Sequence, residues 1–234
     1  MSQLFATLKL DVRLQARSKL YTIGIFVAML LGLAGRFFVH ADYAGRVLAV
    51  FYLAGLGGTT YMFCASLVLL EKSQGTLQAL RTSPLTSTAY IASKVVTLTS
   101  FAVLESAIVY AVAFFGVPLN PVPMITGVVL LGVLYTLVAL GQVASHDSVT
   151  AFLFPGAMCV VLLMQLPMFH VIAGPFPPWY LIPTQGPLLL MLGATQTLDV
   201  WQWLYAIVVS FVSIVLAFQW TKRRFARFLA LQEG

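Results

Sequence analysis

Residues 47–94 read VLAVFYLAGLGGTTYMFCASLVLLEKSQGTLQALRTSPLTSTAYIASK. The first half, from Val47 to Leu70, contains no charged residue, whereas the second half, from Glu71 to Lys94, is polar and holds both acidic and basic residues. A membrane-spanning helix needs roughly 20 mainly apolar residues, so the first half predicts a membrane span. The second half predicts a connection outside the membrane.

The rest of the chain repeats this pattern. Of its 234 residues, 60% are hydrophobic and 9% are charged, far outside the fractions expected of a soluble domain. We therefore predict one domain, 1–234, that is all-α and integral to the membrane, with six transmembrane helices. The apolar runs are Leu20–Val39, Val47–Leu70, Val95–Phe115, Pro123–Ala144, Val149–Met168 and Trp203–Trp220.

The basic residues indicate the orientation. If the connections alternate between the two sides, the thirteen Lys and Arg residues of the chain divide unequally, and only Arg36 and Arg46 lie opposite the termini. Lys and Arg accumulate on the cytoplasmic side of membrane proteins. We therefore predict that both termini are cytoplasmic. The net charge of +6 then reflects this orientation and not a nucleic-acid partner.

Two further segments have patterns of their own. Residues 1–19 carry apolar side chains on one arc of a helical wheel, which predicts an N-terminal amphipathic interfacial helix; they are Leu4, Phe5, Leu8, Val12 and Ala16. Residues 167–202 combine prolines and aromatic residues with the short apolar run Leu188–Gly193. This combination predicts an extracytoplasmic re-entrant segment, because a broken backbone at membrane depth must be buried by protein.

No motif for catalysis or metal binding is visible. The three histidines, His40, His146 and His170, are distant from one another, and the adjacent residues Ser145, His146 and Asp147 do not face each other as a triad would. Both cysteines, Cys64 and Cys159, lie in apolar runs without CxxC spacing. We therefore predict no cofactor in this chain and no enzymatic activity of its own.

Glu105 lies near the middle of the third apolar run. A charged group there costs about 2.5 kcal/mol or more and usually faces the bundle interior or a water-filled path. One interpretation places Glu105 on a substrate path. The other makes it a structural residue, protonated or hydrogen-bonded to Thr59, Thr60, Tyr61 or Gln142, that pins two helices together.

The polar segment also carries a motif. Residues 71–85 resemble a segment of the permeases of the ABC type-2 exporter superfamily, E-(K/R)-x-x-G-T-L-(E/Q)-x-L-x-x-(S/T)-P-L. The matching residues are Glu71, Lys72, Gly75, Thr76, Leu77, Gln78, Leu80, Ser83, Pro84 and Leu85. Residues 178–185, PWYLIPTQ, resemble in particular the fluoroquinolone-export branch of this superfamily.

This resemblance implies a function. The segment 71–94 would contain a cytoplasmic coupling helix that docks on a separate ATPase, with Glu71, Lys72, Gly75, Thr76, Leu77, Leu80 and Pro84 as its coupling residues. Two ATPase copies, which bind ATP and Mg, and a second permease subunit, identical or related, would complete an exporter of an amphiphilic drug. The resemblance further implies that the protein is located in the inner membrane of a bacterial or archaeal cell, in contact with membrane lipid.

Three other functions are compatible with the same sequence. The chain could be a permease for haem or another dedicated cargo, a membrane scaffold or a small membrane enzyme without an ATPase partner, or a secondary transporter. Secondary transporters usually show more spans or paired repeats with broken helices, and neither is seen here. An adjacent reading frame for an ABC ATPase would favour either permease hypothesis.

Overall fold

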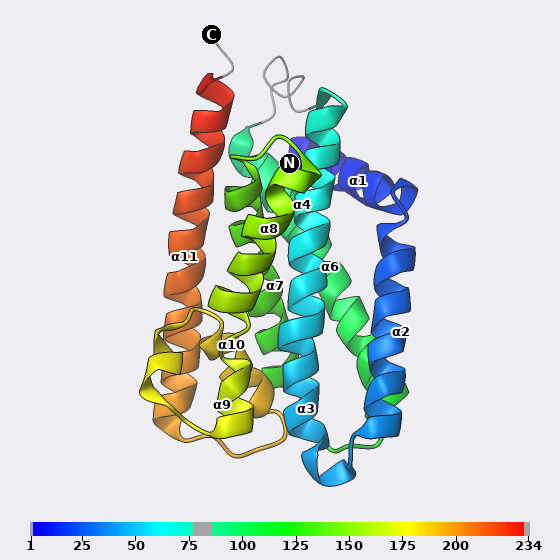
Figure 1. Cartoon of the computed structure of the whole chain (residues 1–234), viewed down its shortest axis with the longest axis vertical. Helices are drawn as coiled ribbons and strands as arrows, with labels where there is room; N and C mark the ends of the chain where they lie inside the picture. The colour runs from blue at the N-terminus through cyan, green and yellow to red at the C-terminus, as the bar shows by residue number, and fades with distance from the viewer. Residues whose placement is uncertain (1, 77–85, 232–234) are drawn as a thin grey trace.

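The structure, a computed structural model, describes residues 2–76 and 86–231, and every regular element in these ranges is helical. The long helices run side by side along one axis (Figure 1). This confirms the all-α prediction for the described residues. The long elements are α2 (Leu20–Phe38), α6 (Ser87–Ala113), α7 (Pro121–Val143), α11 (Val200–Leu231), and the continuous run of α3 (Ala44–Phe51), the π-helix η2 (Tyr52–Leu56) and α4 (Gly57–Ser73). A 3₁₀ turn, η1 (Ala41–Tyr43), precedes α3.

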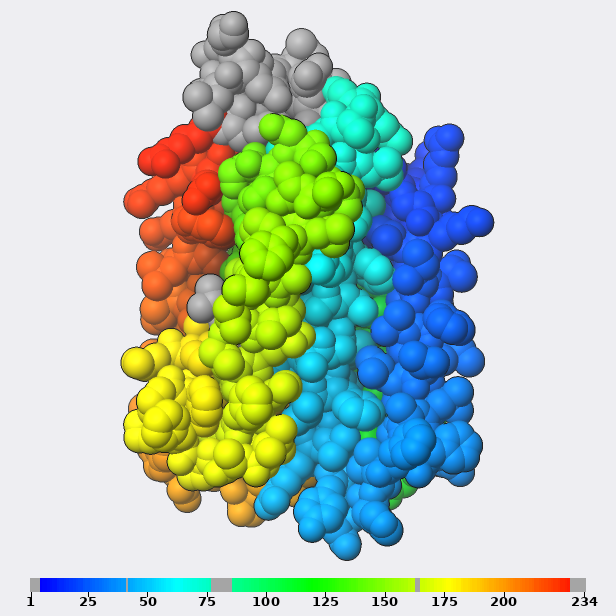
Figure 2. Space-filling model, viewed as in Figure 1, coloured from blue at the N-terminus to red at the C-terminus, as the bar shows by residue number. Residues whose placement is uncertain are grey.

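Five helices are long and apolar enough to cross a membrane. The remaining predicted span, Val149–Met168, forms a shorter helix, α8 (Val149–Met158), followed by a π-helix, η3 (Cys159–Met164). Pro155 lies inside α8, where its ring removes one backbone donor. The six-span count is therefore not confirmed among the described residues. Figure 2 shows α8 covering one face of the bundle, between α11 and α4.

Helix α7 lies at the centre of the bundle. It packs against α4, α6, α10 and α11, and its side chains Leu134, Tyr135 and Leu140 are buried. At Gly57 of α4 an added Cβ would lie 2.8 Å from Cζ of Tyr135. A side chain there would therefore separate α4 from α7, and glycine permits the close approach.

The proline-rich segment contains three short elements. These are α9 (Met168–Ala173), the 3₁₀ helix η4 (Pro177–Leu181) and α10 (Gln185–Leu192). Every residue of α10 is buried, because this helix packs between α7, α11 and α3. Burial inside the protein is the condition under which a short broken helix is tolerated at membrane depth. Whether α10 re-enters the bilayer stays a prediction.

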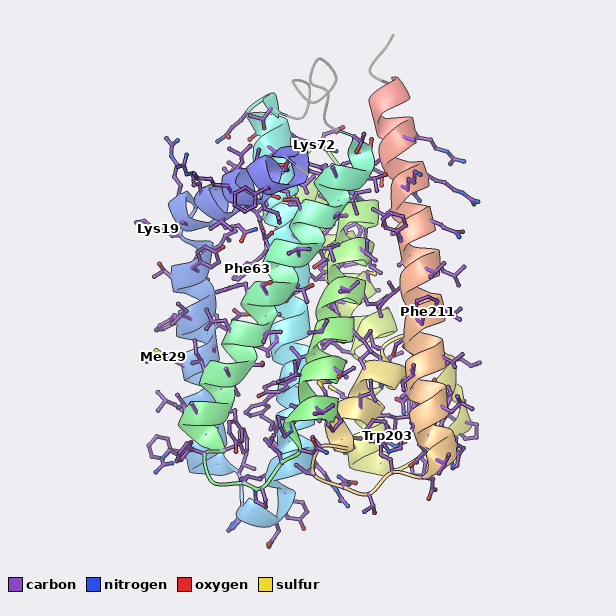
Figure 3. The ribbon with its side chains drawn as sticks, turned by 180° about the vertical axis from the view of Figure 1, so that it is seen from behind. Lys19, Met29, Phe63, Lys72, Trp203 and Phe211 are labelled. Atoms are coloured by element: carbon purple, nitrogen blue, oxygen red, sulfur yellow. The ribbon has the colours of Figure 1, made fainter. Side chains whose placement is uncertain are left out.

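Helix α1 (Ser2–Arg17) lies across the ends of α2 and α6 (Figure 3). It buries polar residues against the bundle, since Thr7, Asp11 and Gln15 are at most 8% exposed. The apolar side chains of Phe5 and Val12 face outward and are exposed. This is the orientation expected of a helix whose apolar face contacts lipid. The interfacial location itself stays a prediction.

Candidate coupling site

A buried ionic cluster joins α1, α4 and α6 at the end of the bundle where α4 ends and α6 begins. The ammonium of Lys94 lies 2.7 Å from Oδ1 of Asp11 and forms a second ion pair with Glu71. Lys94 is completely buried, and both carboxylates are buried as well. The hydroxyls of Ser93 and Tyr90 donate to Asp11 and Glu71, respectively. Each charge in the cluster is therefore paired and hydrogen-bonded, as buried charges must be.

A second set of hydrogen bonds ties α1 to the same place. Gln15 donates from Nε2 to the hydroxyl of Thr97, 2.8 Å away, and its Oε1 accepts from the hydroxyl of Tyr21, also at 2.8 Å. Thr97 belongs to α6 and Tyr21 to α2. Helix α1 is thus fixed to both neighbours by its buried polar face, so a displacement of α6 would move it too.

Lys72, which is labelled in Figure 3, points away from this cluster toward the connection between α7 and α8. Its ammonium donates to the carbonyls of Val143, Ala144 and His146 at 3.2, 3.0 and 2.7 Å. An ion pair with Asp147 at 3.6 Å adds little, because Asp147 is 95% exposed. Adjacent residues of α4 therefore hold two different parts of the bundle, Glu71 the start of α6 and Lys72 the end of α7.

The predicted coupling residues divide into two groups. Glu71, Lys72, Gly75 and Thr76 are described by the structure, whereas Leu77, Leu80 and Pro84 lie outside the described residues. Gly75 has φ 70, in the left-handed region that favours glycine after a helix end. Thr76 donates from its hydroxyl to the carbonyl of Glu71 at 2.9 Å. These residues close the end of α4.

The described part of the chain resumes at Thr86. Its hydroxyl accepts from the backbone N–H of Ala89 and caps α6. The helix begins there, eight residues before the apolar run at Val95. Tyr90 and Lys94 in these first turns contact Glu71 at the end of α4. The described residues on both sides of 77–85 are therefore anchored to the same cluster.

Glu105 lies inside the bundle, 1% exposed. Its Oε2 accepts a hydrogen bond from the hydroxyl of Thr59 at 3.3 Å, and its Oε1 is buried without a hydrogen-bond partner. The hydroxyl of Tyr61 instead donates a hydrogen bond to Oε1 of Gln142. Of the four candidate partners, Thr59 is the one that the structure brings to Glu105. One unpartnered carboxylate oxygen leaves both interpretations of this residue open.

Comparison with known protein families decides which kind of membrane protein this is. The model of the fluoroquinolones export permease protein family matches residues 2–233. The chain belongs to this family. It is 28% identical over 242 residues to fluoroquinolones export permease proteins from two strains of Mycobacterium tuberculosis, with 100% of this chain and 99% of each relative covered. It is therefore a permease with several membrane helices, and the predicted resemblance is confirmed.

The matching range includes every part of the site described above. In this permease, Asp11 and Lys94 are the functional candidates that the sequence did not single out. A signal was present, because Asp11 is the one acidic residue of the N-terminal segment and lies outside its apolar arc. Sequence alone does not show which of the nearby basic residues such a carboxylate meets.

At the opposite end of the permease, His170 of α9 lies beside α10. Its Nδ1 is 3.0 Å from Nε2 of Gln185, and its ring packs edge-on against Tyr180. Partial burial lowers the pKa of His170 below its ordinary value. The neutral ring is therefore favoured near pH 7, which leaves Nδ1 free to accept from the amide of Gln185. His170 thus connects α9 to α10 through its contact with Gln185.

Replacing Gly24 tests the packing around Glu105. An added Cβ at Gly24 of α2 would lie 2.3 Å from Oε1 of Glu105 and 2.5 Å from Cε1 of Phe101. Gly24→Ala is expected to lower the free energy of unfolding by about 1–3 kcal/mol, the usual cost of overpacking. Thermal unfolding of the purified permease measures it. Gly58→Ala is the matched control, because the nearest atom there is 3.6 Å away; equal losses in both variants would contradict the packing described.

Replacing Lys72 tests the tie between α4 and the end of α7. Lys72→Met removes a charged donor that satisfies three carbonyl groups. We expect the free energy of unfolding to fall by about 2 kcal/mol, within the range for hydrogen bonds to charged groups. The comparison is Lys222→Met, which removes an exposed lysine of α11. An unchanged melting temperature for Lys72→Met would show that these contacts do not hold the turn.

Proposed function

We propose that this permease is the membrane-spanning subunit of an ABC exporter. In this proposal, two copies of a separate ATPase hydrolyse ATP, and a second permease subunit, identical or related, completes the path for an amphiphilic drug. The relatives' name, fluoroquinolones export permease protein, supports fluoroquinolones as the first substrates to test. The family match over residues 2–233 carries this proposal. The ATPase docks on the segment between Glu71 and Lys94.

The geometry of the described residues supports this docking site. Glu71 and Lys94 stand at the two ends of the segment and form an ion pair with each other. The same cluster reaches α1 through Asp11, and Lys72 reaches the end of α7. A movement imposed on the segment by an ATPase would therefore be passed at once to α1, α4, α6 and α7. Coupling of ATP hydrolysis to transport needs such a rigid connection. Packed helices shift between discrete arrangements, so a movement at one end can switch the whole bundle.

The proposed orientation places this end of the bundle in the cytoplasm. Helix α1, the start of α6 and the C-terminal end of α11 all lie there (Figure 1). Most of the basic residues belong to these elements, which supports a cytoplasmic location. The segment that contains α9, η4 and α10 then faces the exterior and borders the exit of the path.

Within this proposal, Glu105 contacts the cationic group of a zwitterionic or cationic drug. Its unpartnered Oε1 supplies the acceptor, and its hydrogen bond to Thr59 fixes the side chain. Glu105→Gln is expected to raise the half-saturating drug concentration several-fold while the melting temperature holds. Thr59→Val removes the hydrogen bond without removing the charge and serves as the control. Unchanged transport and drug affinity in Glu105→Gln would leave Glu105 with a structural role alone.

Co-expression with an ABC ATPase from the same genome tests the proposed function. The permease is expected to co-purify with the ATPase, and a fluoroquinolone is expected to stimulate ATP hydrolysis by the complex in lipid. The negative control carries a Walker-A lysine substitution in the ATPase, so that docking persists without hydrolysis. A permease that binds no such ATPase and exports drugs without ATP would contradict the proposal.

A further inference from the structure

A groove of about 820 Å³ lies between α1, α2 and α6. Its apolar walls come from Val12 of α1, Tyr21 and Ile25 of α2, and Phe101 and Leu104 of α6. This volume falls within the roughly 300–1,000 Å³ of pockets that bind small molecules. The groove is therefore large enough for a chain-like ligand laid along the bundle.

The groove opens toward the surface that a membrane would cover. Phe5 of α1 is 72% exposed at its edge, and Val96 and Leu104 of α6 are about half exposed. Exposed apolar side chains of this size on a membrane permease face acyl chains, because water would disfavour them. A ligand of this groove therefore enters from the bilayer and presents an apolar part to the walls.

One end of the groove is positively charged. Lys9 and Arg13, one helical turn apart on α1, both line it. None of the described lining residues is acidic. The nearest carboxylate of α1, Asp11, points to the opposite face, where it is buried against Lys94 and Ser93. The two basic groups are thus available to an anionic head group at the membrane surface.

We propose that this groove is a binding site for one anionic phospholipid of the adjacent leaflet. The phosphate contacts Lys9 and Arg13, and one acyl chain lies against Ile25, Phe101 and Leu104. Charge at the head-group level and an apolar wall below it match the two parts of such a lipid. The bound lipid covers the joint at which Gln15 connects α1 to Thr97 of α6. This site does not depend on the docking of an ATPase.

Native mass spectrometry of the delipidated full-length permease tests the site with two probes of equal chain length, phosphatidylglycerol and phosphatidylcholine. We expect one molecule of phosphatidylglycerol to bind at least about tenfold more tightly than phosphatidylcholine, because its two basic contacts together exceed the roughly 1.4 kcal/mol of a tenfold difference in affinity. Lys9→Gln/Arg13→Gln is expected to abolish this preference. Ser100→Trp, which keeps both charges but fills the groove at a lining residue, is expected to remove the bound lipid.

The matched control is Lys222→Gln/Arg223→Gln, which removes two exposed basic residues of α11 near the same end of the bundle. It is expected to leave the preference unchanged, and melting temperatures confirm that each variant is folded. Equal binding of both lipids by the wild type would overturn the proposal, as would an equal loss in the control. Competitive displacement of phosphatidylglycerol by a fluoroquinolone would also overturn it and would assign the groove to the transported drug.

Discussion

Lys94→Met is expected to destabilise the permease by about 3–5 kcal/mol. The substitution preserves the length of the side chain but leaves the carboxylates of Asp11 and Glu71 buried together without their cation. Removing one partner of a buried ion pair is costly because the remaining charge has no compensation. Here two charges of the same sign remain. The melting temperature of the purified protein and its yield in the membrane should both fall.

The double variant Asp11→Asn/Lys94→Met separates charge from volume. It removes one cation and one anion, so it should be less destabilising than Lys94→Met alone if the ionic contacts account for the loss. Lys222→Met, an exposed lysine on α11, should change stability by less than about 0.5 kcal/mol. A melting temperature of Lys94→Met equal to that of Lys222→Met would contradict the buried cluster.

Leu77→Asp/Leu80→Asp is expected to abolish association with the proposed ATPase while the permease stays folded. The two residues lie outside the described residues, and their role rests on the sequence motif and on the anchored ends of the segment. In the proposed coupling helix, Leu77 and Leu80, three residues apart, would share one face, and a carboxylate on that face would oppose binding to an apolar groove. Co-purification from membranes measures the association, and thermal unfolding measures the fold.

A matched variant places the same charge elsewhere at this end of the molecule. Val149→Asp introduces a carboxylate at an exposed position in the first turn of α8, where the helix dipole tolerates it. It should leave the ATPase bound. If Leu77→Asp/Leu80→Asp still co-purifies with the ATPase and transports drug, the docking site lies elsewhere and the assignment of residues 71–85 fails.

Hydrophobicity predicted much of the fold. Five of the six apolar runs correspond to long apolar helices, because a run of this length is long enough to cross a membrane. Most ends moved by at most three residues, but α6 begins eight residues before its run and α11 continues eleven residues beyond Trp220. The run Val149–Met168 behaved differently. Pro155 removes a backbone donor within it, and the chain continues as a π-helix from Cys159 to Met164. Composition does not show how far such an interruption shortens a helix.

The site was predictable in part. The motif identified Glu71 and Lys72 but not their functions. These two adjacent residues of α4 contact different neighbours, and only the packing around α4 shows which neighbours these are. The sequence suggested an apolar arc on the N-terminal helix, whereas the face that packs is polar and includes Asp11 and Gln15. Long-range pairs such as Asp11 with Lys94 depend on packing, which a single sequence does not record.

The most direct test of the central claim is drug accumulation in inside-out membrane vesicles that contain the permease and its ATPase. With ATP, a fluoroquinolone should accumulate in the lumen, and Leu77→Asp/Leu80→Asp or a non-hydrolysable ATP analogue should reduce accumulation to the background of empty vesicles. Accumulation that continues without ATP hydrolysis, or that persists in the Leu77→Asp/Leu80→Asp variant, would contradict the account of a permease driven through residues 71–94.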